Sequence, residues 1–338
     1  TAEVLGEEEI WQETKMDKKF WKFVQVYHKK FGKGFLYTAN FRSKNEENLF
    51  QDTLLEDIER VFLDVKKVNI PKNQKPKSDK ALFCYIADDH AGIDFKESLF
   101  GNPYDGKTYA QRLLVLAEEV LAQKDIDHLF IVNLGDELDG FNKMTTRGGH
   151  ALDSLSNREQ FDIYTTARKL FYDSILSSGE FKEITIININ NSNHGGNDYS
   201  YIVNKALEFY LDAKYDVNFF NQSKIIDTYS WGDHTIALTH GKDEKYMKSP
   251  MPLNLDVKTD LWLKEYYEQK EGKYFSLIKG DLHAYSVNVG KSGRYINVPS
   301  ICGGSNWIEH NFGSSNSGAL LEIVEKKNKN IHSIPIWF

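Results

Sequence analysis

The sequence predicts an α/β protein in which two β-sheets are flanked by helices. From residue 81 onward, short apolar runs typical of buried strands alternate three times with segments of helical periodicity. After about residue 212 the chain is mostly strand-like, with one helical segment near residues 256–269. Five of the strand-like runs end in Asp, Asn or His, the residue types that bind hard or borderline divalent metals.

Composition places the chain among ordinary globular proteins. Its 338 residues are 41% hydrophobic, enough for one large domain or two ordinary ones with a sizeable core. The net charge of −7 gives no independent argument for nucleic-acid binding. The two cysteines, Cys84 and Cys302, cannot form a disulfide framework, and we expect Cys84 to be a small buried hydrophobe.

Targeting signals are not evident. No apolar run approaches the roughly 18 residues that a membrane span needs, and the first residues do not resemble a signal peptide. The chain begins with Thr1 and not with Met, which suggests native residues upstream. We therefore expect a cytoplasmic protein without a membrane partner.

The N-terminal segment, residues 8–66, is expected to be helical because two apolar stripes follow helical spacing. The stripes are Phe20, Phe23, Val24, Tyr27 and Phe31, then Phe50, Leu54, Ile58, Val61, Phe62 and Val65. The basic and aromatic residues of 18–44 fit contact with a phosphate backbone, or simply an amphipathic helix with lysines facing solvent. Residues 69–80 are polar with two prolines and predict a linker. The expected organisation is a helical region at 1–68, the linker at 69–80 and the main domain at 81–338.

The elements of the main domain follow in order. Strands are expected at 81–87, 129–134, 184–189, 235–239, 274–279, 295–298 and 319–324. Helices are expected at about 108–123, 157–177, 199–211 and 256–269. In α/β folds, ligands bind beyond the carboxyl ends of such strands.

The polar strand endings are the candidate functional residues. They are Asp88 and His90; Asp136 and Asp139; Asn193 and His194; His240; and Asp281 and His283. A single strand-end Asp is more often a helix cap or turn residue, and a single His more often a structural one. Because five endings recur together, we expect a metal site centred on Asp136. His28, His128 and His332 fit no such motif and are expected to be structural.

Taken in this order, the motifs resemble those of the calcineurin-like metallophosphoesterase superfamily from about residue 81 to the last strands. The resemblance implies a four-layer αββα sandwich and two divalent metals that hydrolyse a phosphate ester through a bridging hydroxide. It implies that metal one is bound by Asp88, His90, Asp136 and His283, and metal two by Asp136, Asn193 and His240. Asp136 would bridge the metals, and His194 would contact the phosphate and help to protonate the leaving oxygen.

Two departures from the family pattern bear on the site. The usual G-N-H-D or G-N-H-E is Ser192–Gly195 here, so the acid that steadies His194 is missing; Asp198, Glu137 and Asp139 are the alternatives. The usual G-H-x-H is Gly280–His283 here. Asp281 either ligates metal two or misses it and leaves that site weak. An oxygen-rich site favours Mn²⁺ or Mg²⁺ over Zn²⁺. We expect Mn²⁺, with Mg²⁺, Fe²⁺, Zn²⁺ and Ni²⁺ as alternatives.

The expected function is a phosphodiesterase or nuclease that acts on nucleic acid or nucleotides. In the loop at 141–156, Arg147 and His150 either contact substrate phosphate or are simply solvated. A phosphomonoesterase, either a nucleotide or a protein phosphatase, is the first alternative. Protein phosphatases of the family usually have Arg at the position of Gly140 and Glu at the position of Gly195. These two differences make a protein phosphatase the less expected branch. The second alternative is a non-catalytic metal- or nucleotide-binding module with a decayed site. The presence of His194 argues against it, because this residue has no metal-binding role for such a module to preserve. The oligomeric state stays open.

Overall fold

The computed structural model describes residues 21–31, 34–43, 57, 78–95, 103–241, 251–304, 309 and 316–338. The chain divides into two compact units, Thr1–Glu56 and Asp57–Phe338. The linker and domain boundaries expected from the sequence stay predictions, since most of residues 69–80 lies outside the described ranges.

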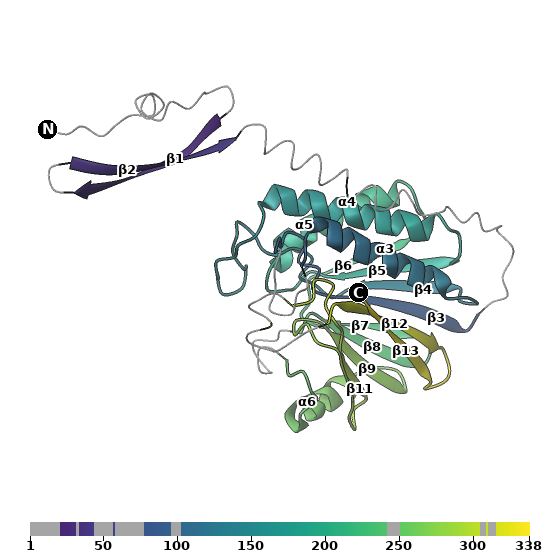
Figure 1. The fold of residues 1–338 in the computed structure, drawn as a ribbon. Coiled ribbons are helices and arrows are strands. Elements are labelled where there is room, and N and C mark those ends of the chain that lie inside the picture. Colours follow the sequence, from purple (N-terminus) through teal and green to yellow (C-terminus); the bar gives the residue numbers. More distant parts are fainter. Residues whose placement is uncertain are drawn as a thin grey trace. The chain divides into compact units, whose positions relative to one another are not determined.

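The described part of the first unit is a β-hairpin, so the predicted helix is wrong for these residues. Strand β1 (Trp21–Phe31) pairs antiparallel with β2 (Gly34–Ser43), with Phe31 opposite Gly34 (Figure 1). Aromatic and β-branched residues of this segment fit a strand as well as a helix, and only Gly32 and Lys33 lie between the strands in the sequence. Apart from Asp57, the rest of the predicted helical segment lies outside the described residues.

The second unit contains two mixed sheets. The six-stranded sheet has the order β13-β12-β3-β4-β5-β6. Its strands are β3 (Lys80–Ile86), β4 (His128–Asn133), β5 (Glu183–Ile189), β6 (Asn218–Gln222), β12 (Gly318–Glu325) and β13 (Ile331–Trp337). The five-stranded sheet has the order β10-β11-β9-β8-β7. Its strands are β7 (Asp227–Trp231), β8 (His234–Thr239), β9 (Tyr274–Lys279), β10 (Ser286–Val289) and β11 (Arg294–Asn297).

Helices form the two outer layers. They are α3 (Gly106–Ala122), α4 (Asn157–Leu176), α5 (Gly196–Asp212) and α6 (Val257–Tyr267). Figure 1 shows α3, α4 and α5 along the six-stranded sheet and α6 beside the five-stranded sheet. Three of the helices start at capping side chains, namely Asp105, Ser156 and Asp256, because each accepts a backbone N–H that the first turn leaves free.

Two apolar clusters hold the layers together. Between the sheets, Val132 and Ile187 of one sheet pack with Ile236 and Ile278 of the other. On the outer face of the five-stranded sheet, Leu263 is one of the α6 side chains that meet the strands. The predicted four-layer αββα sandwich is therefore confirmed, and burial of these faces is its main source of stability.

The parallel strands determine where the site lies. Strands β3, β4 and β5 are parallel, as are β8 and β9, so the carboxyl ends of each set emerge at one edge of their sheet. Loops at such an edge are where α/β proteins bind ligands. Among the described residues, no helix is both long and apolar enough to cross a bilayer.

Candidate metal centre

The candidate residues come together at these strand ends. Asp88 and His90 follow β3, Asp136 follows β4, Asn193 follows β5, His240 follows β8, and Asp281 and His283 follow β9. Asp136 belongs to two of the groups of acidic and histidine side chains close enough to hold a metal ion, one with Asp88 and His240 and one with His90 and His194. The residue expected at the centre of the site is thus at the centre of the cluster.

The backbone is strained at the same residues. Asp88, His90, Asp136, Asp281 and His283 have φ between 44° and 73°, which is the left-handed region. Non-glycine residues rarely adopt this conformation, and each such residue costs roughly 1–3 kcal/mol. Strain of this kind persists where the surrounding structure imposes it, and it is concentrated at functional sites.

One glycine is required by close packing at the centre. Gly135 has φ 99°, and a Cβ there would lie 2.9 Å from both His240 Nδ1 and the Ser192 side chain. A larger residue would push His240 away from Asp136.

Each of three histidines is anchored through Nδ1. His90 Nδ1 lies 3.2 Å from Asp139 Oδ1. His240 Nδ1 donates to the Leu134 carbonyl at 2.8 Å, and His283 Nδ1 donates to the Gly303 carbonyl at 2.8 Å. Such bonds fix the tautomer and leave Nε2 as the lone-pair atom, as in many metal-binding histidines.

The Nε2 atoms face carboxylates or have no partner. His240 Nε2 lies 3.0 Å from Asp136 Oδ2, and His283 Nε2 lies 3.9 Å from Asp88 Oδ1. His90 Nε2 is buried without a hydrogen-bond partner among the described residues. A buried polar atom without a partner needs an explanation, and a bound cation is one.

The amide of Asn193 is the clearest sign that the cluster suits a cation. The end of its amide that faces the cluster lies 2.7 Å from His240 Nε2 and 3.2 Å from both Asp136 Oδ2 and Asp281 Oδ1. If that end is the oxygen, it faces only acceptors. A cation between these four atoms would satisfy all of them. The alternatives are a reversed amide and a protonated His240, whose Nε2 lies 3.0 Å from Asp136 Oδ2 and whose pKa Asp136 raises well above its usual value against burial. The residues therefore fit a divalent ion, and Asp281 lies among them.

Burial and neighbouring charges shift the pKa values of Asp88 and Asp136 in opposite directions. Burial, aided by Asp136 and Asp281, raises the pKa of Asp88 to about 7, although His240 and His90 oppose it. Burial also acts on Asp136, but His240 and His194 outweigh it and hold the pKa of Asp136 well below its usual value. The Asp281 N–H donates to Asp88 Oδ2 at 3.1 Å. A metal ion could displace the proton that Asp88 holds below pH 7.

His194 is held by Asp139. Its Nδ1 lies 2.5 Å from the Asp139 carbonyl and 3.5 Å from Asp139 Oδ1, and its backbone N–H donates to Asp136 Oδ1 at 2.8 Å. Burial favours the neutral ring, but Asp136 and Asp139 outweigh it and raise the pKa of His194 to about 9. Its side chain is 18% exposed, against 6% or less for the three anchored histidines. His194 is therefore the histidine that a substrate can reach.

Of the three acids considered for steadying His194, the structure brings Asp139 to it. Glu137 is buried elsewhere and accepts bonds from Ser200 and Asn204. Asp198 is exposed in the first turn of α5.

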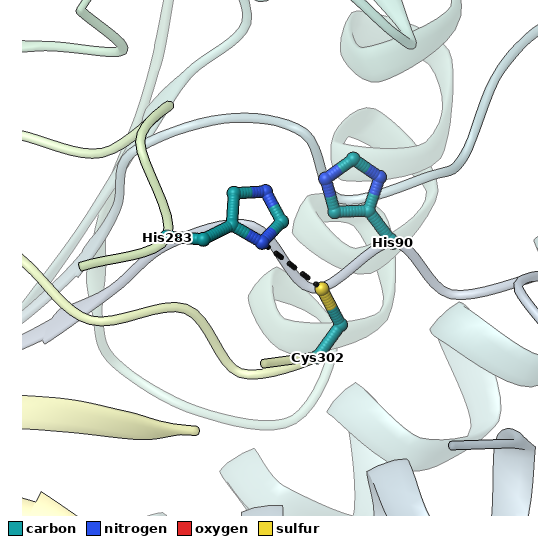
Figure 2. A group of neighbouring side chains, drawn as sticks. All are labelled: His90, His283 and Cys302. Atoms are coloured by element: carbon teal, nitrogen blue, oxygen red, sulfur yellow. Dashed lines mark hydrogen bonds between the residues drawn. The ribbon is translucent and has the colours of Figure 1, made fainter. Parts of the chain in front are cut away.

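Sequence reasoning missed two buried groups near the site. Figure 2 shows Cys302 beside His283, with its thiol 3.5 Å from His283 Nδ1, while the His90 ring faces His283. Burial raises the thiol pKa of Cys302 well above its usual value, so the thiol packs behind His283 as a neutral group. Lys279 is the second; it is fully buried at the end of β9, and burial lowers its pKa to about 8 against the pull of Asp281. Lys279 directly precedes the motif Gly280–His283, whereas Cys302 is 19 residues beyond His283 and has no sequence signal.

The loop after Asp139 lies against the Asn193–His194 backbone. The N–H groups of Thr146 and Arg147 donate to the carbonyls of His194 and Asn193 at 3.2 and 3.1 Å. Arg147 Nη2 donates to Asn191 Oδ1 at 3.2 Å, so this side chain lies near the end of β5. His150 is exposed, and a Cβ on Gly148 would lie 2.9 Å from its Nε2, so the ring lies over the loop's own backbone.

The same loop begins with a tight turn that exposes two large apolar side chains. Phe141 and Met144 exchange backbone hydrogen bonds of 2.9 and 3.1 Å. Asn142 and Lys143 between them both have positive φ, the geometry of a type I′ turn. Phe141 and Met144 are each 45% exposed, and the Phe141 ring packs against Tyr199 at 5.1 Å.

Comparison with known proteins gives little sequence similarity. No protein-family model matches the chain. No curated protein matches it either. Among solved structures, Vps29 from Entamoeba histolytica in complex with Zn²⁺ is 11% identical, with 76% of this chain and 98% of that chain covered and a TM-score of 0.34. A novel archaeal phosphodiesterase is 11% identical, with 75% and 99% covered and a TM-score of 0.36.

A putative 5′-nucleotidase from Staphylococcus aureus is 15% identical, with 76% of this chain and 54% of that chain covered and a TM-score of 0.35. The two mixed sheets and outer helices of this chain are the fold that the sequence resemblance predicted. At such identities and TM-scores, no conclusion about activity follows from them.

Proposed function

We propose that the protein is a binuclear metal-dependent phosphoesterase, and that it acts as a phosphodiesterase or nuclease on nucleotides or nucleic acid. The observation that carries the proposal is the convergence of Asn193, His240, Asp136 and Asp281 on one point, where the metal-free protein can supply a donor only by reversing the Asn193 amide or by protonating His240 Nε2. A divalent cation is the group that satisfies such a set.

Two ligand sets share Asp136. Asp88, His90 and His283 would complete one set with it, and Asn193, His240 and Asp281 the other. The aspartate oxygens make the second set harder than the usual histidine would, which favours Mn²⁺ over Zn²⁺. When bound, two such ions supply a water nucleophile acidic enough to act at neutral pH and neutralise charge on the phosphoryl oxygens.

His194 would supply the proton for the leaving group. Its Nδ1 is occupied by Asp139, which leaves Nε2 for the substrate. The raised pKa keeps the ring protonated at neutral pH, so Nε2–H can hydrogen-bond the leaving oxygen and then donate its proton to it. Asp139 keeps the ring in place while the proton moves and stabilises its charged form.

The loop at 141–156 supports a substrate with a nucleobase. Arg147 lies beside the Asn193 segment, where its guanidinium can bind a phosphate oxygen. Phe141 follows Asp139 by two residues, so its Cα lies within about 7 Å of the Asp139 Cα. An exposed Phe and Met at the two ends of a hydrogen-bonded turn form a surface on which a base can stack.

A substrate panel tests the proposal. The chelated protein is supplied with Mn²⁺ and offered bis-p-nitrophenyl phosphate, p-nitrophenyl phosphate, cyclic nucleotides, and single-stranded and duplex DNA. We expect the diesters to be cleaved faster than the monoester, and only with metal. Preference for the monoester would identify a phosphomonoesterase. Metal binding without hydrolysis of any ester would identify a non-catalytic module.

A further inference from the structure

We propose that a buried ion pair, Arg168 with Asp89, positions the two candidate metal ligands that flank Asp89 in the sequence. The inference rests on the proposed function, because it assigns a role to residues that hold metal ligands without binding metal themselves. Arg168 and Asp89 are here positioning residues.

Asp89 lies between Asp88 and His90, but its carboxylate bonds to the helical layer. Arg168 of α4 reaches Asp89 Oδ2 with Nη2 at 2.5 Å and with Nε at 3.1 Å. The Tyr109 hydroxyl of α3 donates to the same oxygen at 2.9 Å. Two helices thus hold one side chain of the β3 loop.

The backbone of Asp89 is held as well. The Tyr104 hydroxyl donates to the Asp89 carbonyl at 2.6 Å. Asp89, Arg168, Tyr104 and Tyr109 are all at most 1% exposed. Neither the side chain nor the peptide of Asp89 can turn without breaking a buried bond to a charged or hydroxyl partner, which is unfavourable away from water.

The ion pair lies next to strained backbone. Asp88 has φ 53° and His90 has φ 44°, so the residues on both sides of Asp89 are in the left-handed region. A loop released from Asp89 would relax toward ordinary φ values, and both ligand side chains would rotate with it. Holding the middle residue therefore restrains both ligands, in addition to the backbone bonds from the Asp88 N–H to the Gly135 carbonyl and from the His90 N–H to the Asp136 carbonyl.

The Arg168–Asp89 ion pair contributes little to the free energy of unfolding by itself. Asp89 Oδ1 and Arg168 Nη1 are buried without hydrogen-bond partners among the described residues. Burying two charges with incomplete hydrogen bonding is often no better for folding than an apolar pair of similar size. The geometry gives the charged pair another role: a carboxylate held by Arg168 of the helical layer neither binds the metal nor adds net charge beside Asp88.

The test replaces the pair by apolar residues and uses a second buried pair as its control. Arg294 of β11 and Glu322 of β12 form an ion pair with side chains 19% and 2% exposed, and neither is a candidate ligand. Full-length wild type, Asp89→Leu/Arg168→Met and Glu322→Leu/Arg294→Met are compared by Mn²⁺ titration calorimetry and by metal-free thermal unfolding.

We expect both double variants to unfold cooperatively, but only Asp89→Leu/Arg168→Met to bind Mn²⁺ at least about 10-fold more weakly, the usual scale for loss of an outer-sphere partner. The single variant Arg168→Lys keeps Asp89 and the positive charge, so its Mn²⁺ affinity should lie between those of the double variant and the wild type. Wild-type Mn²⁺ affinity in Asp89→Leu/Arg168→Met, or an equal loss in the control pair, would overturn the inference.

A milder variant covers the case in which the double variant does not fold. Tyr104→Phe removes one hydroxyl and its bond to the Asp89 carbonyl, and Tyr164→Phe, which loses only its bond to Asn204, is its match. We expect weaker Mn²⁺ binding in Tyr104→Phe alone, and equal affinity in both would overturn the inference. Wild-type protein that binds no Mn²⁺ would instead contradict the proposed function itself.

Discussion

His194 Nδ1 lies 2.5 Å from the backbone carbonyl of Asp139, whose carboxylate is also 3.2 Å from His90 Nδ1. One residue therefore orients both a candidate metal ligand and the candidate acid. This contact gives His194 an acidic partner that the residue after it in the sequence does not supply. The chain has Gly195 at that position, and it obtains the carboxylate from the loop after β4 instead.

Asp139→Asn should lower both metal affinity and turnover, by roughly 10–100-fold, because it weakens the support of His90 and His194 together. Asp198→Asn is the matched control, since Asp198 is an exposed acid close to the same motif. Mn²⁺ titration and kcat on an unactivated diester measure the two effects. A variant Asp139→Asn that behaves like Asp198→Asn would show that Asp139 does not support the site.

His194→Ala should leave metal content nearly unchanged and reduce turnover by about 10²–10⁴-fold, the usual scale for loss of a general acid. The reduction should be smaller for p-nitrophenyl esters, because p-nitrophenolate leaves without needing a proton. Metal analysis is combined with turnover on an activated and an unactivated ester. Loss of metal together with activity would mean that His194 is a ligand and not the acid.

Metal binding should weaken as pH falls below about 7. In the metal-free protein the pKa of Asp88 is raised to about 7, so below that pH a proton must leave before the carboxylate can bind a cation. The apparent Mn²⁺ affinity should then fall by about tenfold per pH unit below 7. The proton that His240 must release, because Asp136 raises its pKa against burial, adds to this dependence in the same direction. Titrations between pH 5.5 and pH 8.5, a range of about three units around that pKa, test the sign. A flat profile would show that Asp88 is ionised throughout or is not a ligand.

Phe141→Ala should raise KM for substrates with a base and leave kcat largely intact. Loss of one stacking side chain corresponds to roughly 1–3 kcal/mol, or about 5–150-fold. Thymidine 5′-p-nitrophenyl phosphate and methyl p-nitrophenyl phosphate share a leaving group, and only the first carries a nucleoside with a base, so KM should rise for the first ester alone. Phe209→Ala on α5, where the ring is 65% exposed, is the control. Equal KM changes for both esters would exclude base stacking at Phe141.

Local signals explain how much of this fold was predictable. Buried strands such as β4 are unbroken apolar runs, and α4 begins at a capping box of Ser156 and Glu159. Both signals lie within a few residues, so periodicity and caps locate these elements closely. The strand-end motifs were predictable for the same reason, because parallel strands bring their carboxyl ends to one edge.

The elements that were missed lack such signals. Strand β6 is short and polar, and β13 carries Pro335, which only an edge strand tolerates. In the N-terminal segment, aromatic residues fit a period of two as well as one near four, and the hairpin prevailed over the predicted helix.

The contacts around the site could not be read from the sequence because they are distant in the chain. Arg168 is 79 residues from Asp89, and Cys302 is 19 residues from His283. No local pattern marks either pair, since each depends on how helices and strands pack in three dimensions. Asp139 was one of the strand-end candidates and one of three candidate acids for His194. Only the folded chain shows that it contacts both His90 and His194.

The most direct test of the central claim is the number of Mn²⁺ ions bound per chain, measured together with hydrolysis of bis-p-nitrophenyl phosphate. Asp136 is the carboxylate that both ligand sets share. Wild-type protein should therefore bind two ions and hydrolyse the ester only when they are present, while Asp136→Asn should lose metal and activity together. Full hydrolysis in the presence of a chelator, or a wild-type chain that binds no Mn²⁺, would contradict the assignment of a binuclear metal centre.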